Sequence, residues 1–167
     1  MIPINPCDLP SSALLGKYVY EGAFTDCYVT QIPTSVSLAE YVEAFYTTPV
    51  FKLERLILRW FVSKPSTDAD ARRLAQAQVE SFSAWSVEGR APDQLLLCDF
   101  HRRTRSWLMV APNESGVGTR LYFGSAVVPV RTKSGERRLG FIFSALLGFH
   151  KLYSRILLRA ARSRLTT

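Results

Sequence analysis

Asp99 and His101 are the residues best suited to acid–base chemistry, and they lie two positions apart in the segment CDFHRRTR. If a strand continues through both positions, their side chains share one face, and the carboxylate can fix the tautomer of the imidazole. Such a pair is typical of general acid–base catalysis. The alternative is that His101 begins a polar turn and faces water. No second polar cluster accompanies the pair, so the sequence does not identify catalytic residues for this protein.

Three other side chains have the chemistry to hold a ligand in an apolar cavity. Arg120 and Tyr122 alternate on one face of an expected strand, and Trp107 belongs to the strand before it. Together they offer a cation, a hydroxyl and an aromatic wall. The structural alternative is that these large side chains only fill the space between a sheet and a helix.

His150 lies near the edge of the apolar arc of the last expected helix. It is either a hydrogen-bonded core residue or a polar contact that orients a ligand held by apolar surface. Cys7, Cys27 and Cys98 are far apart and lack a C-x-x-C spacing, which argues against a disulfide framework and a zinc site. The sequence also lacks the HExxH, GxSxG, GxGxxG and GxxxxGK[ST] motifs. We therefore expect no metal and no cofactor.

The elements that position these residues belong to a protein of 167 residues, 47% hydrophobic and 12% aromatic. This composition excludes disorder as the main state and fits one domain with a sizeable core. The N-terminus lacks the basic and apolar regions of a signal peptide. The longest uncharged apolar stretch, Leu139–Phe149, is too short to cross a bilayer. These features predict a cytoplasmic protein.

Local patterns predict an irregular arm, strand segments and then three helices in the first half of the chain. Ser37 with Glu40 three residues later is a capping box for a helix that ends near Tyr46. Thr48-Pro49 opens the next helix, because proline is tolerated in a first turn. The expected elements are the arm over 1–17, strand segments over 18–32, and helices over 37–46, 48–61 and 67–79.

The second half of the chain predicts an antiparallel meander and a long helix. Segments rich in β-branched and aromatic residues are separated by short polar turns, which favours hairpin connections. The expected strands are Phe82–Glu88, Gln94–Phe100, Arg105–Ala111 and Thr119–Val130. A helix without internal proline then runs from about Arg138 to Arg164.

This order of elements resembles the START-like helix-grip superfamily, which includes polyketide cyclase-like and lipid-transfer proteins. The resemblance is carried by SLAEYVEAFYTTPVFKLERLILRWF, FSAWSVEGRAPDQLLL, SWLMVAP followed by GTRLYFGSAVV, and LLGFHKLYSRILLRAA. It implies an α+β fold in which a curved antiparallel sheet wraps around the C-terminal helix. It further implies one domain over 18–164, with a helical insertion at 67–79, and an apolar ligand between the sheet and the helix.

Positive charge is concentrated at the C-terminal end. Residues 1–130 carry a net charge of −1, and residues 131–167 carry +8, within a total of +7. On a helical wheel Lys151, Arg155, Arg159 and Arg162 share a narrow arc. The opposite side holds the apolar residues Phe149, Leu152, Tyr153, Ile156, Leu157 and Ala160.

The basic arc has two interpretations. It is either the solvated back of a packed helix or a contact surface for anionic lipid. Nucleic acid is disfavoured as a partner, because aromatic residues do not interleave with the basic ones.

We therefore expect a binding protein that encloses a hydrophobic small molecule or lipid between the sheet and the C-terminal helix. The candidate ligand contacts are Asp99, His101, Trp107, Arg120, Tyr122 and His150. One alternative is a cyclase- or hydrolase-like enzyme that uses Asp99 and His101 in the same cavity. Another is a membrane-surface protein that uses Lys151, Arg155, Arg159 and Arg162.

Overall fold

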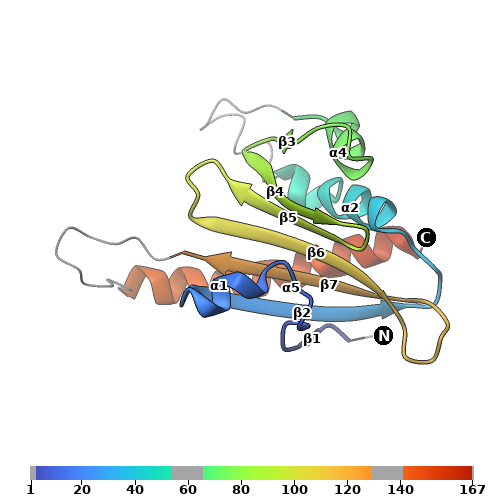
Figure 1. Cartoon of the computed structure of the whole chain (residues 1–167), viewed down its shortest axis with the longest axis horizontal. Coiled ribbons are helices and arrows are strands. Elements are labelled where there is room, and N and C mark those ends of the chain that lie inside the picture. Colours follow the sequence, from blue (N-terminus) through green and yellow to red (C-terminus); the bar gives the residue numbers. More distant parts are fainter. Residues whose placement is uncertain (1–2, 54–65, 129–140, 167) are drawn as a thin grey trace.

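A single antiparallel sheet of seven strands forms the centre of the α+β structure (Figure 1). The computed structural model describes residues 3–53, 66–128 and 141–166, and it leaves the side chains of residues 141–150 undescribed. The sheet is open, and its strand order is β1-β2-β7-β6-β5-β4-β3. The strands are β1 (Asn5–Pro6), β2 (Phe24–Ile32), β3 (Ser81–Phe82), β4 (Trp85–Ala91), β5 (Gln94–Asp99), β6 (Thr104–Pro112) and β7 (Thr119–Val127).

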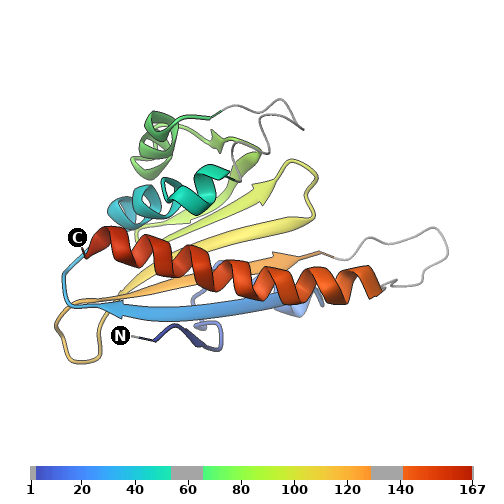
Figure 2. The same cartoon turned by 180° about the vertical axis from the view of Figure 1, so that it is seen from behind.

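Helices cover the two faces of the sheet unequally. One face carries α2 (Leu38–Tyr46), α4 (Asp68–Ala75) and the long α5 (Phe141–Leu165), which crosses β2 and β7 (Figure 2). The other face carries the N-terminal arm and the short α1 (Gly16–Tyr20) (Figure 1). We call these the helix face and the arm face.

The predicted helix starts are confirmed where the structure describes them. Ser37 and Thr67 each accept a hydrogen bond from the backbone three residues later, and both capping boxes are complete. The third helix ends at Ala75 rather than near Val79, because Ala77 adopts a left-handed φ of 57°. Residues 49–53 are helical, and the rest of the predicted 48–61 helix lies outside the described residues.

The predicted meander is also confirmed, except that Phe82–Glu88 is not one strand. Ser83 adopts a left-handed φ of 56°, and the chain turns there between β3 and β4. Strands β4 to β7 pair antiparallel with their neighbours in sequence. Gly118, in the turn before β7, has a φ of +86°, and a Cβ there would lie 2.1 Å from the Ile32 carbonyl oxygen. Only glycine fits that approach. The last helix begins by Phe141, as its periodicity predicts, and residues 138–140 lie outside the described part.

The N-terminal prediction is wrong in one respect. Residues expected to form the first strand segment, from Tyr18, instead form α1, and β2 begins only at Phe24. Gly22, with a φ of +73°, permits the turn between them. The arm also contributes the two-residue strand β1, which pairs with β2.

Each face of the sheet has its own hydrophobic core. The helix-face core contains aromatic residues from α2 and the strands, among them Phe45, Tyr46 and Phe123. The smaller arm-face core contains Leu15 and Trp107, both fully buried. Burial of each such side chain stabilises the fold by roughly 1.5–3 kcal/mol, so the arm is an integral layer of the protein.

Candidate functional site

The arm is fixed to the sheet by the buried amide of Gln94 on β5. Its Oε1 accepts hydrogen bonds from the Leu14 backbone N–H and from Trp107 Nε1, both at 2.9 Å. Its Nε2 donates to the Ser12 carbonyl oxygen at 3.0 Å. Gln94 is 4% exposed, so these bonds take the place of hydrogen bonds to water for the Leu14 N–H, the Trp107 Nε1–H and the Ser12 carbonyl oxygen. They fix the position of the arm on the sheet.

A charge cluster that includes the buried Arg105 fixes α1 beside the arm. Glu88 of β4 pairs with Lys17 Nζ at 2.6 Å and with Arg105 Nε at 2.7 Å. The Tyr18 hydroxyl donates to Glu88, and Arg105 donates to that hydroxyl oxygen at 2.7 Å. The Arg105 guanidinium also lies 4.7 Å from the centre of the Tyr18 ring. These contacts leave the next residues of α1, Val19 and Tyr20, 48% and 93% exposed.

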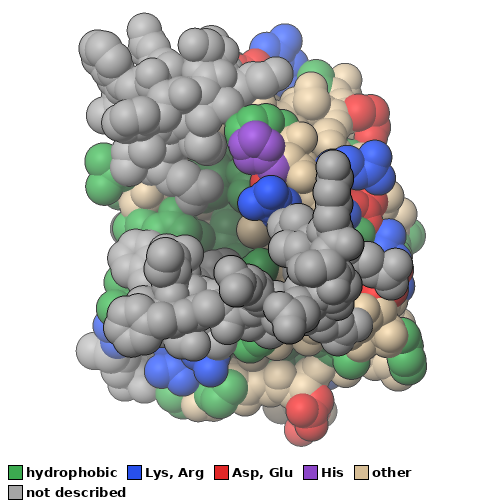
Figure 3. Space-filling view, turned by 90° about the vertical axis from the view of Figure 1, so that its left-hand side faces the viewer, with side chains coloured by type: hydrophobic (Ala, Val, Ile, Leu, Met, Phe, Trp, Pro, Cys, Tyr) green, Lys and Arg blue, Asp and Glu red, His purple; other side chains and the backbone are tan. Residues whose placement is uncertain are grey.

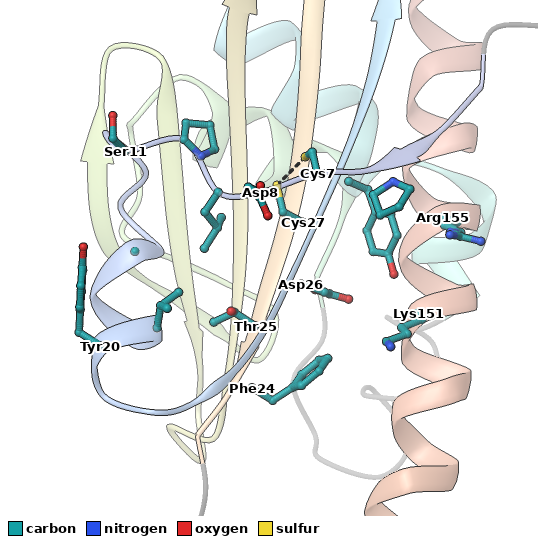
Figure 4. A pocket seen from close by; sticks show the side chains of 16 residues that line it. Cys7, Asp8, Ser11, Tyr20, Phe24, Thr25, Asp26, Cys27, Lys151 and Arg155 are labelled. Carbon is teal, nitrogen blue, oxygen red and sulfur yellow. Dashed lines mark hydrogen bonds between the residues drawn. The ribbon is translucent and has the colours of Figure 1, made fainter.

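A pocket of about 740 Å³ opens where the arm, α1, β2 and α5 meet (Figure 4). In Figure 4, Tyr20 of α1 lies on one side of β2, and Lys151 and Arg155 of α5 lie on the other. The walls of the pocket combine proline, aliphatic and aromatic side chains with a few polar ones. The lining residues are Pro6, Cys7, Asp8, Leu9, Pro10, Ser11, Gly16, Val19, Tyr20, Phe24, Thr25, Asp26, Cys27, Tyr28, Lys151 and Arg155.

The pocket exists because β1 covers only part of the β2 edge. Pairing runs from Asn5 opposite Val29 to Pro6 opposite Tyr28, and one further backbone bond joins Cys7 to Cys27. The chain then crosses onto the arm face, so β1 does not pair with residues 24–26 of β2. Since successive strand residues point to opposite faces, β2 contributes side chains to both halves of the pocket.

Two cations from α5 define the chemistry of the helix-face half. Lys151 Nζ lies 5.9 Å from the centre of the Phe24 ring, and the Arg155 guanidinium lies 5.3 Å from the centre of the Tyr28 ring. Both residues remain exposed, so an incoming anion can reach them. Burial raises the pKa of Tyr28, which keeps its hydroxyl protonated as a hydrogen-bond donor.

The described side chains of α5 fill the space above the sheet where the sequence predicted a cavity. Ser154, Leu157, Leu158 and Ala161 are buried, the last three within the helix-face core. The described pocket is therefore at the β2 edge rather than beneath this part of the helix. Figure 3 views the left-hand end of Figure 1, where the described surface has hydrophobic side chains next to basic ones.

Trp107, Arg120 and Tyr122 do not face α5. Trp107 and Tyr122 belong to the arm-face core, with ring centres 6.3 Å apart. Arg120 donates to the Pro112 carbonyl oxygen and pairs with Glu114 at 3.0 Å. Arg120 and Tyr122 share one face of β7, as predicted. That face is the arm face, whereas the cavity was predicted between the sheet and the C-terminal helix. Strand periodicity determines which residues share a face and leaves open which layer covers that face.

Asp99 and His101 are not brought together as a pair. β5 ends at Asp99, whose Oδ1 accepts hydrogen bonds from the backbone N–H groups of Arg103 and Thr104 at 2.7 and 2.9 Å. His101 is exposed in the turn, with its ring 3.9 Å from that of Phe100. The turn interpretation therefore describes His101. His150 belongs to α5, and its side chain lies outside the described part.

The basic arc of α5 differs from its expected arrangement. Arg159 is exposed, but Arg162 is half-buried and donates to Thr30 Oγ1 at 3.1 Å. Leu152 and Ile156, expected on the buried side, are 58% and 41% exposed. The buried arc is centred between Leu157 and Leu158, which places Leu152 and Ile156 beside the basic residues rather than opposite them.

Sequence reasoning missed the partnership of Cys7 and Cys27. Their sulfur atoms lie 3.2 Å apart, although 20 positions separate them in the chain. Only the pairing of β1 with β2 brings them together, and β1 is too short to leave a strand pattern. Cys98 is buried on β5.

A scan against protein-family models, a search of curated proteins and a search of solved structures each found no match. Within the described residues, no three His, Cys, Asp or Glu side chains are grouped as metal ligands. None of the helices, as far as the structure describes them, combines the length and the apolar character needed to cross a membrane.

Proposed function

We propose that this protein binds a hydrophobic small molecule or lipid with an anionic end, in the pocket at the β2 edge. The observation that carries the proposal is the pairing of apolar walls with Lys151 and Arg155 at one side of a pocket of about 740 Å³. Ligand sites of roughly 300–1,000 Å³ with few polar groups are typical of small-molecule binding proteins.

The orientation of the ligand follows from the distribution of charge. An anionic group would lie near Lys151 and Arg155, where two cations give charge-assisted hydrogen bonds. The apolar part would extend past the β2 edge toward Leu9 and Val19. Tyr20, which is 93% exposed on the pocket wall, is the side chain with the most apolar surface to gain from a bound ligand.

We also propose that the fold is a divergent helix-grip of the START-like kind. Support comes from the open antiparallel sheet, the capped helix after the first long strand and the C-terminal helix that crosses the sheet. The ligand position differs from the expectation for that superfamily, because the described part of α5 packs tightly on the sheet.

The first test measures binding of a long-chain fatty acid and of the corresponding alcohol. The combined substitution Lys151→Ala and Arg155→Ala should weaken carboxylate binding about 10-fold or more, because charge-assisted hydrogen bonds contribute roughly 1.5–3 kcal/mol. Alcohol binding should change little. Arg159→Ala is the control, because it removes one positive charge from α5 outside the pocket lining.

Three results would contradict the ligand proposal. One is failure of the protein to bind either compound in titration or in native mass spectrometry. Another is an equal loss of binding in Arg159→Ala. The third is equal weakening of acid and alcohol binding by the paired substitution, which would show that Lys151 and Arg155 do not recognise the carboxylate.

A second candidate function is contact with an anionic membrane surface. Leu152 and Ile156 are exposed next to Lys151, Arg155 and Arg159 on the outer side of α5, which we call the outer α5 face. Apolar side chains beside basic ones are typical of helices that lie at a membrane interface. Co-sedimentation with vesicles that contain phosphatidylserine, at low and high salt, tests this candidate.

A further inference from the structure

Cys7 and Cys27 form a close dithiol in the wall of the pocket. Their sulfur atoms are 3.2 Å apart, shown as the dashed line in Figure 4. The backbone N–H of Cys7 donates to the Cys27 carbonyl oxygen at 3.0 Å, which continues the register of β1 and β2 by one residue. The two cysteines therefore lie directly opposite each other across an antiparallel pair.

This arrangement suits an intramolecular disulfide. Directly opposite residues in a hydrogen-bonded antiparallel pair have Cα atoms about 5.5 Å apart. That separation lies within the range of roughly 4.4–6.8 Å that disulfides span. To form the bond, the sulfur atoms must close from 3.2 Å to a bond length of about 2.05 Å.

The two thiols differ in access and acidity. Cys7 is half-buried, whereas Cys27 is 5% exposed, and both line the pocket. The contact with Cys27 lowers the pKa of the Cys7 thiol, and the contact with Cys7, together with burial, raises the pKa of the Cys27 thiol. The more acidic thiol is thus the one that solvent reaches first, which is the pattern of a reactive cysteine beside a resolving one.

We infer that Cys7 and Cys27 are a reversible redox site that reacts with hydroperoxides to form a disulfide. The Cys7 thiolate attacks the O–O bond and forms a sulfenic acid, while the hydroperoxide leaves as an alcohol, or as water when it is hydrogen peroxide. The Cys27 thiol then displaces water from the sulfenic acid to form the Cys7–Cys27 bond. The two sulfur atoms lose two electrons in total, and these electrons reduce the O–O bond. A dithiol reductant restores both thiols by exchange.

Oxidation would lock the arm to β2 at the point where the chain leaves the sheet edge. A crosslink over 20 positions restricts the unfolded chain, and the midpoint of thermal unfolding should rise by roughly 6–12 °C. The redox site does not depend on the proposed ligand, because the 3.2 Å sulfur contact is made by protein groups alone.

The test treats the whole protein with hydrogen peroxide and maps its peptides. We expect two of the three thiols to be lost, a mass lower by two hydrogen atoms, and one peptide pair joined through Cys7 and Cys27. Dithiothreitol should reverse the change. Cys98→Ser should behave like the parent protein, because Cys98 lies on β5 and lines no part of the pocket.

Two variants assign the order of reaction. In Cys27→Ser, a sulfenic-acid probe such as dimedone should label Cys7 at least about 10-fold faster than Cys98. In Cys7→Ser, labelling of Cys27 should be about 10-fold slower than that of Cys7. Peptide mapping of the unsubstituted protein keeps the test valid if a variant fails to fold. Retention of both thiols, linkage between two molecules, or oxidation of Cys98 as fast as Cys7 would overturn the inference.

Discussion

Glu88 shows how one half-buried carboxylate can help to hold a short helix on a sheet. Burial raises its pKa, but hydrogen bonds from Lys17 and Tyr18 and the charge of Arg105 outweigh that effect and lower the pKa to about 2. The ordinary pKa of glutamate is near 4.5, so folding favours the ionised form. The stabilisation is complete above about pH 4.5 and is lost as the pH falls toward 2.

Glu88→Gln should therefore lower the free energy of unfolding by about 2 kcal/mol near neutral pH, because Arg105 would keep a buried charge without its counter-ion. The difference between the two proteins should shrink as the pH falls from about 4.5 to 2, where Glu88 itself becomes protonated. Urea unfolding at several pH values measures both effects.

Glu114→Gln is the control, because it removes a carboxylate from the exposed pair with Arg120 and should change stability by less than about 0.5 kcal/mol. A constant difference between parent and Glu88→Gln from pH 7 to pH 2 would contradict the linkage argument.

Contacts at this scale could not be predicted from the sequence. Tyr18 and Glu88 are 70 positions apart, and Tyr18 and Arg105 are 87 apart. Neither pair leaves a local pattern, and the same is true of Cys7 and Cys27. The partners of Asp99 were equally unpredictable, since its carboxylate accepts hydrogen bonds from backbone N–H groups of its own turn rather than from an imidazole.

At the scale of elements, short sequence patterns were sufficient to predict a helix or strand whose conformation depends on residues close together in the chain. Ser37 and Thr67 mark helix starts because capping depends on residues three apart, and the structure confirms both. Tyr18–Tyr20 is helical although its residues favour strands, because the contacts of Lys17 and Tyr18 with Glu88 and Arg105 outweigh a weak intrinsic preference.

Gln94→Leu should detach the arm without disrupting the sheet. The change leaves the Leu14 N–H and Trp107 Nε1–H without acceptors, and each buried orphan costs roughly 1–3 kcal/mol. We expect the free energy of unfolding to fall by about 3 kcal/mol and amide exchange to accelerate first in residues 7–16.

Gln31→Leu provides the comparison for this change, because Gln31 is exposed on β2 and its replacement should alter stability by less than about 0.5 kcal/mol. Uniformly faster exchange over the whole sheet in Gln94→Leu, with the arm no more affected than β6, would show that Gln94 is not a specific clamp.

For the molecule as a whole, the class and the meander followed from sequence, but the assignment of layers did not. Alternation along β7 correctly placed Arg120 and Tyr122 together, yet it could not tell the arm face from the helix face. The sheet has an N-terminal layer as well as a helical one, because the arm contributes Leu15 and α1 contributes Tyr18 to a second core. That layer is what creates a pocket at the β2 edge.

The charge distribution bears on both proposed functions at this scale. Residues 1–130 are nearly neutral, and the excess positive charge lies at the C-terminal end, which includes the outer α5 face. Each basic residue near an anionic surface contributes about 1 kcal/mol, so Lys151, Arg155 and Arg159 alone would give weak, salt-sensitive attachment. Leu152 and Ile156 add apolar area that salt does not screen.

The paired substitution Leu152→Ser and Ile156→Ser separates membrane contact from ligand binding. It should reduce co-sedimentation with phosphatidylserine vesicles by about 10-fold or more, because the two side chains lose the gain from burial in the interface. Fatty-acid binding should persist, since neither residue lines the pocket. Arg102→Ala with Arg103→Ala, on the exposed turn between β5 and β6, controls for a general loss of charge. If this control weakens vesicle binding while the leucine–isoleucine variant binds like the parent protein, the attraction is a property of net charge, and the outer α5 face has no specific role.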